Sequence, residues 1–187
     1  MRIVAGRNRG RRLVAPAGGT ARPPADRARQ ALFNILGSAA GCALDGARVV
    51  DCFAGTGALG LEALSRGAAH ACFLESHPAA LAALAANIAA LGEAERTTAI
   101  RGDATRPPPA VLPCRLALLD PPYHSGLAGP CLEALARGGW LADGAVAVVE
   151  VAAREPFAAP SGFVVVDERI YGAARLVFLR HSGAAVL

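Results

Sequence analysis

Short apolar runs alternate along the chain with segments in which apolar residues recur at helical spacing. Four of these runs are nearly continuous, which is typical of strands buried on both faces of a sheet. They lie at 49–53, 71–74, 116–119 and 146–151, and a weaker strand is expected at 98–101. The helices expected between them lie at 58–66, 76–91 and 127–135. Because strands and helices alternate, the pattern predicts a mostly parallel α/β sheet covered by helices on both faces.

The C-terminal part of the chain departs from this repeat. Two further apolar runs, at 163–166 and 176–179, are joined through Tyr171-Gly172 and contain no helical spacing between them. Such a pair is typical of antiparallel strands joined by a turn. It predicts that an antiparallel pair closes a seven-stranded sheet.

The N-terminal part departs in a different way. Segments 2–5 and 11–15 flank a turn that contains Gly and Asn, a pattern that predicts a β-hairpin. Asp26 is then expected to cap a helix over 27–36 that ends at Gly37. We therefore expect a small extension at 1–37, followed by the main domain at 38–187.

Charge is concentrated in this extension. The first 29 residues hold eight arginines and a single acid, whereas the rest of the chain holds more acids than arginines. The guanidinium group suits phosphates and guanine edges, so the basic head predicts a polyanionic partner. A solvated basic arm without a partner remains the alternative.

The remaining composition narrows the class of protein. At 187 residues, 53% of them apolar, the chain is long enough for one domain with a substantial core. We find no apolar run of about 18 residues and no secretory leader, so we expect a cytoplasmic protein. The five cysteines form no Cys-x-x-Cys pair, which indicates buried free thiols and no metal site.

In a doubly wound sheet, ligands bind beyond the carboxyl ends of the strands, so the residues there matter most. After the first strand, the segment from Asp51 to Gly60 contains G-x-G-x-x-G, which by itself indicates only a nucleotide-like ligand. Glu75 follows the second strand and is placed to accept hydrogen bonds from ribose hydroxyls. Asp103-Ala104 follows the third strand, where a carboxylate could accept from an adenine amino group.

The segment after the fourth strand is the most specific motif of the chain. Asp120-Pro121-Pro122-Tyr123 combines a carboxylate, two residues without a backbone N–H and an aromatic ring. This arrangement predicts a pocket made of hydrogen-bond acceptors, with carbonyl oxygens available beside Asp120. Such a pocket suits a planar base with an –NH₂ group that stacks on Tyr123. A rigid turn would explain the prolines alone, but not the flanking Asp and Tyr.

Together these motifs resemble the Rossmann-like, class I methyltransferases that act on exocyclic amines. The N-terminal part resembles one family of them, the RsmD family, which makes N2-methylguanosine in 16S ribosomal RNA. The segments that carry the family resemblance are Met1–Gly6, Arg22-Pro23, Asp26-Arg27-x-Arg29, Leu32–Asn34, Asp51–Gly55, Leu61–Arg66 and Gly139–Leu141. The similarity covers roughly residues 1–180. Pro24-Ala25, Gln30 and Pro107–Pro109 depart from the family pattern, and the tail from His181 has no counterpart.

The resemblance implies a monomeric enzyme that uses S-adenosyl-L-methionine and acts on 16S ribosomal RNA, in the assembled or assembling small subunit. Its catalytic residues would be Asp120, Pro121, Pro122 and Tyr123. Its cofactor-binding residues would be Asp51, Phe53, Ala54, Gly55, Thr56, Gly57, Glu75, Asp103 and Ala104. The RNA-binding residues would be Arg2, Arg7, Arg9, Arg11, Arg12, Arg27 and Arg29.

Three other functions fit part of the sequence. A DNA adenine or protein glutamine methyltransferase could use a similar pocket, although the chain has no room for a DNA-recognition domain. A dinucleotide oxidoreductase would use the glycine motif and Glu75, but it leaves Asp120–Tyr123 unexplained. A ribosome-assembly factor that binds RNA without catalysis is separated from the enzyme only by an assay.

Overall fold

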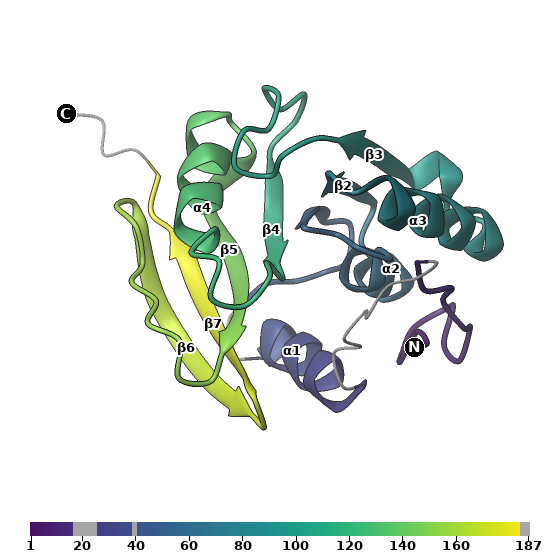
Figure 1. Ribbon diagram of the computed structural model, residues 1–187, viewed down its shortest axis with the longest axis horizontal. Helices are drawn as coiled ribbons and strands as arrows, with labels where there is room; N and C mark the ends of the chain where they lie inside the picture. The colour runs from purple at the N-terminus through teal and green to yellow at the C-terminus, as the bar shows by residue number, and fades with distance from the viewer. Residues whose placement is uncertain (17–25, 39–40, 184–187) are drawn as a thin grey trace.

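The computed structural model describes residues 1–16, 26–38 and 41–183. Within them, seven strands form one sheet in the order β3-β2-β1-β4-β5-β7-β6 (Figure 1). The strands are β1 (Arg48–Cys52), β2 (His70–Glu75), β3 (Thr97–Arg101), β4 (Cys114–Leu119), β5 (Leu141–Ala152), β6 (Phe163–Tyr171) and β7 (Ala174–His181). The helices are α1 (Asp26–Ser38), α2 (Ala58–Ser65), α3 (Pro78–Leu91) and α4 (Ala128–Arg137), with a 3₁₀ turn η1 (Ala94–Arg96).

The first five strands are parallel, and the last two run against them. β1 pairs in parallel with both β2 and β4, and β4 pairs in parallel with β5. β7 pairs antiparallel with β5 and with β6, so the expected closing pair is confirmed. The chain steps from β1 outward to β3 and then returns to β4 on the other side of β1. This change of direction between β1 and β4 is the place where α/β sheets bind ligands.

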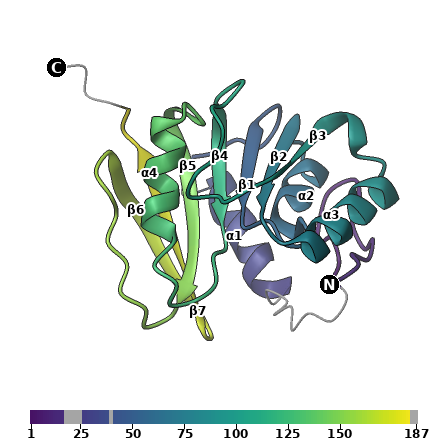
Figure 2. The ribbon, with the colours of Figure 1, turned by 45° about the horizontal axis from the view of Figure 1, so that its top comes forward.

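Both faces of the sheet are buried at β1, β2, β4 and β5, which explains their continuous apolar runs, whereas the edge strands β3 and β6 are largely exposed. Val49 points into one core with residues of α1, α2 and α3, whereas its neighbour Val50 points into a second core with residues of α4. Figure 2 shows α4 lying over β5, on the far side of the sheet from α1. Side chains alternate between the faces of a strand, so a strand covered on both faces is apolar at every position.

Residues 1–15, which we call the N-terminal hairpin, fold back antiparallel and pack on the body. Ile3 and Arg11 are joined by a backbone bond of 2.9 Å, Leu13 bonds Met1 at 3.0 Å, and an isolated bridge links Arg2 to Arg12. Gly6 lies against α2 so closely that an added Cβ would be 1.8 Å from the Ser65 carbonyl oxygen. Ile3 and Leu13 belong to the core that contains Val49.

Several boundaries differ from the expectation. β5 starts at Leu141 rather than 146, since a register shift in its pairing with β4 lets it continue across Gly144. β6 continues to Tyr171 through polar residues because it is the edge strand, with Val164 and Ile170 exposed. α1 passes through Gly37 to Ser38. The capping by Asp26, the side chain of Arg27 and the Arg22–Ala25 segment lie outside the described residues.

None of the helices in the described parts of the chain is long and apolar enough to cross a membrane. The five cysteines are all buried and carry no disulfide.

Candidate active site

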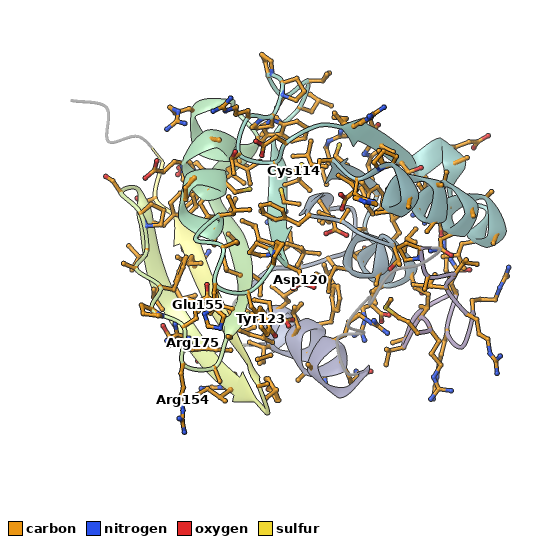
Figure 3. All side chains as sticks on the ribbon, viewed as in Figure 1. Cys114, Asp120, Tyr123, Arg154, Glu155 and Arg175 are labelled. Atoms are coloured by element: carbon orange, nitrogen blue, oxygen red, sulfur yellow. The ribbon has the colours of Figure 1, made fainter. Side chains whose placement is uncertain are left out.

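A cavity of about 990 Å³ opens at the carboxyl edge of the sheet. Its walls come from the ends of β1 to β4, from β5, from the turn between β6 and β7, and from α1. The lining includes Ala28, Phe53, Leu74, Glu75, Ser76, His77, Gly102, Asp103, Ala104, Asp120, Pro121, Pro122, Tyr123, Leu127, Glu150 and Tyr171–Ala174. Figure 3 shows Asp120 and Tyr123 just beyond the lower end of β4, above α1. The strand ends therefore meet as the sequence predicts.

The loop after β1 is shaped by backbone conformations and contacts that glycine permits. Gly55 and Gly57 have φ values of 56° and 78°, and Phe53 before them has φ 59°. An added Cβ on Gly57 would lie 2.3 Å from a Leu84 methyl carbon, and one on Gly60 would lie 2.4 Å from the Phe73 ring. The glycines thus let the loop turn sharply and let α2 pack closely on the sheet.

Asp51 supports this loop from below. It is 1% exposed, and its carboxylate accepts a 2.8 Å hydrogen bond from the Gly60 N–H. Burial raises the pKa of Asp51 well above its usual value, the Gly60 bond lowers it, and the charges of Asp120 and Glu75 raise it further. Glu75 and Asp120, which line the cavity, are thus close enough to act on Asp51, and their carboxylates favour a ligand with positive charge.

Glu75 is held in place by two backbone N–H groups. Its Oε2 accepts a hydrogen bond from Gly55 and its Oε1 accepts one from His77, both at 2.8 Å. These bonds join the end of β2 to the glycine loop and fix the direction of the carboxylate. A carboxylate oriented in this way retains acceptor capacity for hydroxyl groups of a ligand.

Asp103 lies at the end of β3, beside the buried Ala104. Its Oδ1 accepts hydrogen bonds from the backbone N–H and the hydroxyl of Thr105, both at 2.8 Å. These two bonds lower the pKa of the Asp103 carboxyl. The carboxylate therefore stabilises a turn while it lines the cavity.

The segment after β4 is anchored to β5. The Tyr123 hydroxyl donates a 2.8 Å hydrogen bond to Oε1 of Glu150, which itself lines the cavity. The Pro122 carbonyl accepts a 3.2 Å bond from the Ser125 N–H. Of the proline carbonyl oxygens expected beside Asp120, that of Pro122 already accepts this bond, because the chain turns back at Ser125. The candidate acceptors are the Asp120 carboxylate and the Pro121 carbonyl.

His124 and Glu155 hold the far side of this segment. His124 has φ 60°, a strained value for a residue with a side chain. Its imidazole Nδ1 lies 3.8 Å from Glu155 Oε2, and the same carboxylate oxygen accepts a 3.1 Å bond from the Ala152 N–H. Burial raises the pKa of Glu155, but backbone hydrogen bonds from His124 and Ala152, together with the charges of His124 and Arg175, lower it by more, so the net shift is downward. The Tyr123 loop is thus tied to β5 on both sides.

The structure brings together eight of the predicted site residues in the cavity lining. They are Phe53, Glu75, Asp103, Ala104, Asp120, Pro121, Pro122 and Tyr123. The other five predicted cofactor residues form the loop itself or lie under it. They are Asp51, Ala54, Gly55, Thr56 and Gly57, all of which except Gly55 are buried.

Glu150 and the turn at 171–174 also line the cavity, and neither was predicted from the sequence. Glu150 follows the apolar stretch 146–149 near the end of the fifth strand, so the rule applied to the other strand ends would have found it. The turn comes from the antiparallel pair, for which no such rule exists.

The predicted RNA-binding arginines divide into two groups. Arg29 is 1% exposed and its guanidinium bonds the Arg2 carbonyl, so the structure corrects the expectation that Arg29 contacts RNA. Arg7 is about half exposed and pairs with the buried Glu93, and Arg11 bonds the Ala90 carbonyl. Arg2, Arg9 and Arg12 are exposed on the hairpin, and the side chain of Arg27 lies outside the described residues.

The donor and acceptor set of the cavity fits S-adenosylmethionine. Carboxylates from four strands face it, and they match the hydroxyls, amino groups and positive charge of that molecule. Within the described residues, no three His, Cys, Asp or Glu side chains are grouped as metal ligands. A doubly wound sheet with an antiparallel closing pair, a glycine loop after β1 and Asp-Pro-Pro-Tyr after β4 defines a class I methyltransferase fold.

Comparison with known proteins places the chain within this class. The family model described as Conserved hypothetical protein 95 matches residues 1–180. The chain therefore belongs to this family, the RsmD family. It is 38% identical to ribosomal RNA small subunit methyltransferase D of Escherichia coli over 150 residues, which cover 80% of this chain and 74% of that protein.

Two further similar proteins support this family assignment. The protein of the same name from Haemophilus influenzae is 32% identical over 176 residues, which cover 92% of this chain and 89% of that protein. The solved structure of the putative methyltransferase yhhF from Escherichia coli superimposes with a TM-score of 0.82 at 33% identity and covers 98% of each chain.

Proposed function

We propose that this protein transfers a methyl group from S-adenosylmethionine to the exocyclic N2 amine of a guanine in small-subunit ribosomal RNA, guanine 966 by family naming. The observation that carries the proposal is the shared cavity. Asp120 and Tyr123 line the same cavity as Glu75 and Asp103. A site suited to the target amine therefore lies next to a site suited to the nucleoside part of the cofactor. Relatives that carry the name of a ribosomal RNA methyltransferase support the substrate class.

The chain's own residues would hold the cofactor as follows. Glu75, fixed by Gly55 and His77, would accept from the ribose hydroxyls, and Asp103 with Ala104 would lie beside the adenine. The glycine loop would lie against the methionine end of the cofactor. When bound, S-adenosylmethionine supplies an electrophilic methyl group on a positively charged sulfur. The carboxylates of Glu75 and Asp120, which line the cavity, would favour that charge.

The Asp120–Tyr123 segment would position the amine. The nitrogen lone pair of guanine N2 is delocalised into the ring, which makes the group a poor nucleophile. Oxygens of Asp120 and Pro121 that accept its N–H bonds direct the lone pair out of the ring plane, and Tyr123 supports the base by stacking. Catalysis then arises mainly from positioning and charge complementarity. Because Glu150 accepts a hydrogen bond from the Tyr123 hydroxyl, the ring is held in place.

The RNA would be held by the basic surface of the hairpin. Arg2, Arg9 and Arg12 are exposed there, and Arg7 and Arg11 keep part of their guanidinium groups at the surface; Arg27 is proposed from its sequence position. A base inside a helix cannot reach the cavity, so the target guanine is unpaired or turned out of its stack. In this proposal, the protein acts as a monomer in the cytoplasm, where ribosomes assemble.

Methyl transfer from labelled cofactor to naked 16S RNA, to assembled small subunits and to an adenine-rich DNA duplex tests this function. The proposal expects label in N2-methylguanosine, identified after digestion to nucleosides, and in the RNA or subunit samples alone. Label in N6-methyladenosine would instead identify a different exocyclic-amine methyltransferase. RNA binding without any label would identify a non-catalytic assembly factor.

A further inference from the structure

Asn87 lies in the middle of α3 with 1% exposure, and its side-chain amide joins two distant parts of the chain. Its Oδ1 accepts a 2.7 Å hydrogen bond from the Val14 N–H, and its Nδ2 donates to the Val14 carbonyl at 3.1 Å. The same Nδ2 donates a 3.0 Å bond to the Thr56 carbonyl. Both N–H groups of the amide are thus used, one by the hairpin residue Val14 and the other by Thr56 of the loop after β1.

One of these directions is the glycine loop after β1. Thr56 is the central residue of Gly55-Thr56-Gly57, and its carbonyl shares a rigid peptide plane with the Gly57 N–H. That N–H closes the loop by donating to the Ala54 carbonyl at 2.7 Å. Because the peptide is planar, holding the Thr56 oxygen also fixes the direction of the Gly57 N–H. The loop in turn supplies the Gly55 N–H that orients Glu75.

The other direction is the end of the N-terminal hairpin. Val14 is bonded by Asn87 through both its N–H and its carbonyl, in the way a neighbouring strand would bond it. The other polar anchors of the hairpin use different parts of the body. Ser65 accepts the Asn8 N–H at 3.0 Å, and Glu62 accepts the Val4 and Ala5 N–H groups. These two anchors lie on α2, and neither they nor the hairpin contacts to Glu93 and the Ala90 carbonyl involve the glycine loop.

We propose that Asn87 is a positioning residue that couples docking of the N-terminal hairpin to the shape of the cofactor loop. With Val14 in place, the Asn87 amide is held so that its second N–H points at Thr56. When Val14 leaves, the amide is free to turn, and the loop that orients Glu75 loses its support. The assignment of this loop to the cofactor rests on the proposed function.

Such coupling works in both directions. A cofactor that requires the closed loop favours the docked hairpin, and an RNA that binds the docked hairpin favours the closed loop. The structure thus links the surface proposed for RNA to the site proposed for the methyl donor through a single buried amide.

The test measures the dissociation constant of S-adenosylhomocysteine by titration calorimetry, without RNA, for matched full-length variants. Asn87→Ala removes the bridge. Val14→Pro removes the N–H on the hairpin side only, at an exposed side chain that follows the already paired Leu13. Ser65→Ala is the control, because it breaks a buried hairpin contact that does not involve the loop.

Asn87→Ala is expected to weaken cofactor binding about tenfold, equivalent to about 1.4 kcal/mol. Val14→Pro is expected to weaken it about threefold in the parent protein and to add nothing in the Asn87→Ala background. Ser65→Ala is expected to change it by less than about twofold, although it lowers the unfolding midpoint. In methylation assays, Val14→Pro raises the KM for the cofactor and leaves kcat near the parent value.

Unchanged cofactor affinity in Val14→Pro would overturn the coupling, as would an equal loss in Ser65→Ala. If Asn87→Ala does not fold, Asn87→Asp replaces it, since that variant keeps the acceptor for Val14 and loses both donors; normal affinity there would also overturn the proposal. The result is separable from the proposed function. A protein that shows this pattern but methylates no RNA would contradict the function alone, and a methylating enzyme with normal Val14→Pro binding would contradict the coupling alone.

Discussion

In the catalytic cavity, backbone N–H groups hold carboxylates toward a ligand, whereas under the N-terminal hairpin buried carboxylates hold the backbone. Glu75 is aimed into the cavity by Gly55 and His77. Glu62, by contrast, is fully buried and accepts the N–H groups of Val4 and Ala5 at 2.7 and 3.0 Å. The same chemical group thus recognises a ligand in one region and attaches a chain segment in the other.

The arginines show the same division. Arg66 pairs with Glu62 at 2.7 Å, Arg29 lies 3.7 Å from it with its side chain fully buried, and Arg7 pairs with Glu93. Arg9 and Arg12 remain exposed. A cluster of positive charge in the sequence is therefore part structural and part available for a partner. Substitutions in the cavity and under the hairpin separate these two uses.

Asp120→Ala should reduce kcat by about a thousandfold, since the amine loses the acceptor that aligns it and such donor–acceptor removals cost two to three orders of magnitude. Binding of S-adenosylhomocysteine should change by less than about twofold. Single-turnover methylation and calorimetry measure the two quantities. Asp120→Asn, which keeps one acceptor oxygen, should retain part of the activity. A loss of cofactor binding equal to the loss of rate would contradict the assignment.

Glu62→Ala should lower the free energy of unfolding by roughly 3 kcal/mol, because it leaves buried N–H groups and two arginines without their shared acceptor. Urea denaturation followed by circular dichroism measures the effect. Glu133→Ala is the matched control: its ion pair with Arg137 is exposed on both sides, so its loss should cost less than about 0.5 kcal/mol. Similar costs in the two variants would show that the hairpin anchor is not structural.

Tyr123→Phe should lower kcat about fivefold, because the ring can still stack but is no longer held by Glu150. Glu150→Gln should have a similar effect, and the double variant should be no worse than either single one. The KM for the cofactor should stay near the parent value. Steady-state assays on a 16S RNA fragment measure these constants, and fully additive losses would separate the roles of the two residues.

Arg9→Ala and Arg12→Ala should each weaken RNA binding a few-fold. Each should also lower the slope of log affinity against log salt by about 0.7, the value for one single-strand phosphate contact. Filter binding across a salt series measures both. Arg29→Met provides the contrast: it should lower thermal stability and leave the salt slope unchanged, because Arg29 is buried. A reduced slope in Arg29→Met would show that Arg29 contacts RNA after all.

The fold could be predicted from the sequence because a doubly covered parallel sheet leaves a clear periodic pattern. Val49 and Val50 face different cores, so the run is apolar throughout and reads as a buried strand. The strand ends then identify the site, since parallel strands bring their carboxyl ends to one edge. The early start of β5 could not be predicted, because it depends on a register shift with β4 rather than on local pattern.

Burial and pairing of individual polar residues could not be predicted. Nothing in the sequence distinguishes the buried Arg29 from the exposed Arg9, because the difference depends on where Glu62 lies in space. Asn87 gives a partial signal, since it is a polar residue next to the buried stripe of Leu84, Ile88 and Leu91. A polar residue at such a position indicates a structural role, but only the fold shows that its partners are Val14 and Thr56.

The central claim is that the Asp120–Tyr123 segment receives the 2-amino group of a guanine. The most direct test replaces the target guanine, located by mapping the methylated product, with inosine or with 2-aminopurine in an otherwise identical RNA. Inosine lacks the 2-amino group, and 2-aminopurine keeps it without the O6 oxygen. The account predicts no methyl transfer to the inosine RNA and measurable transfer to the 2-aminopurine RNA. Equal transfer to the inosine and guanine RNAs would contradict it.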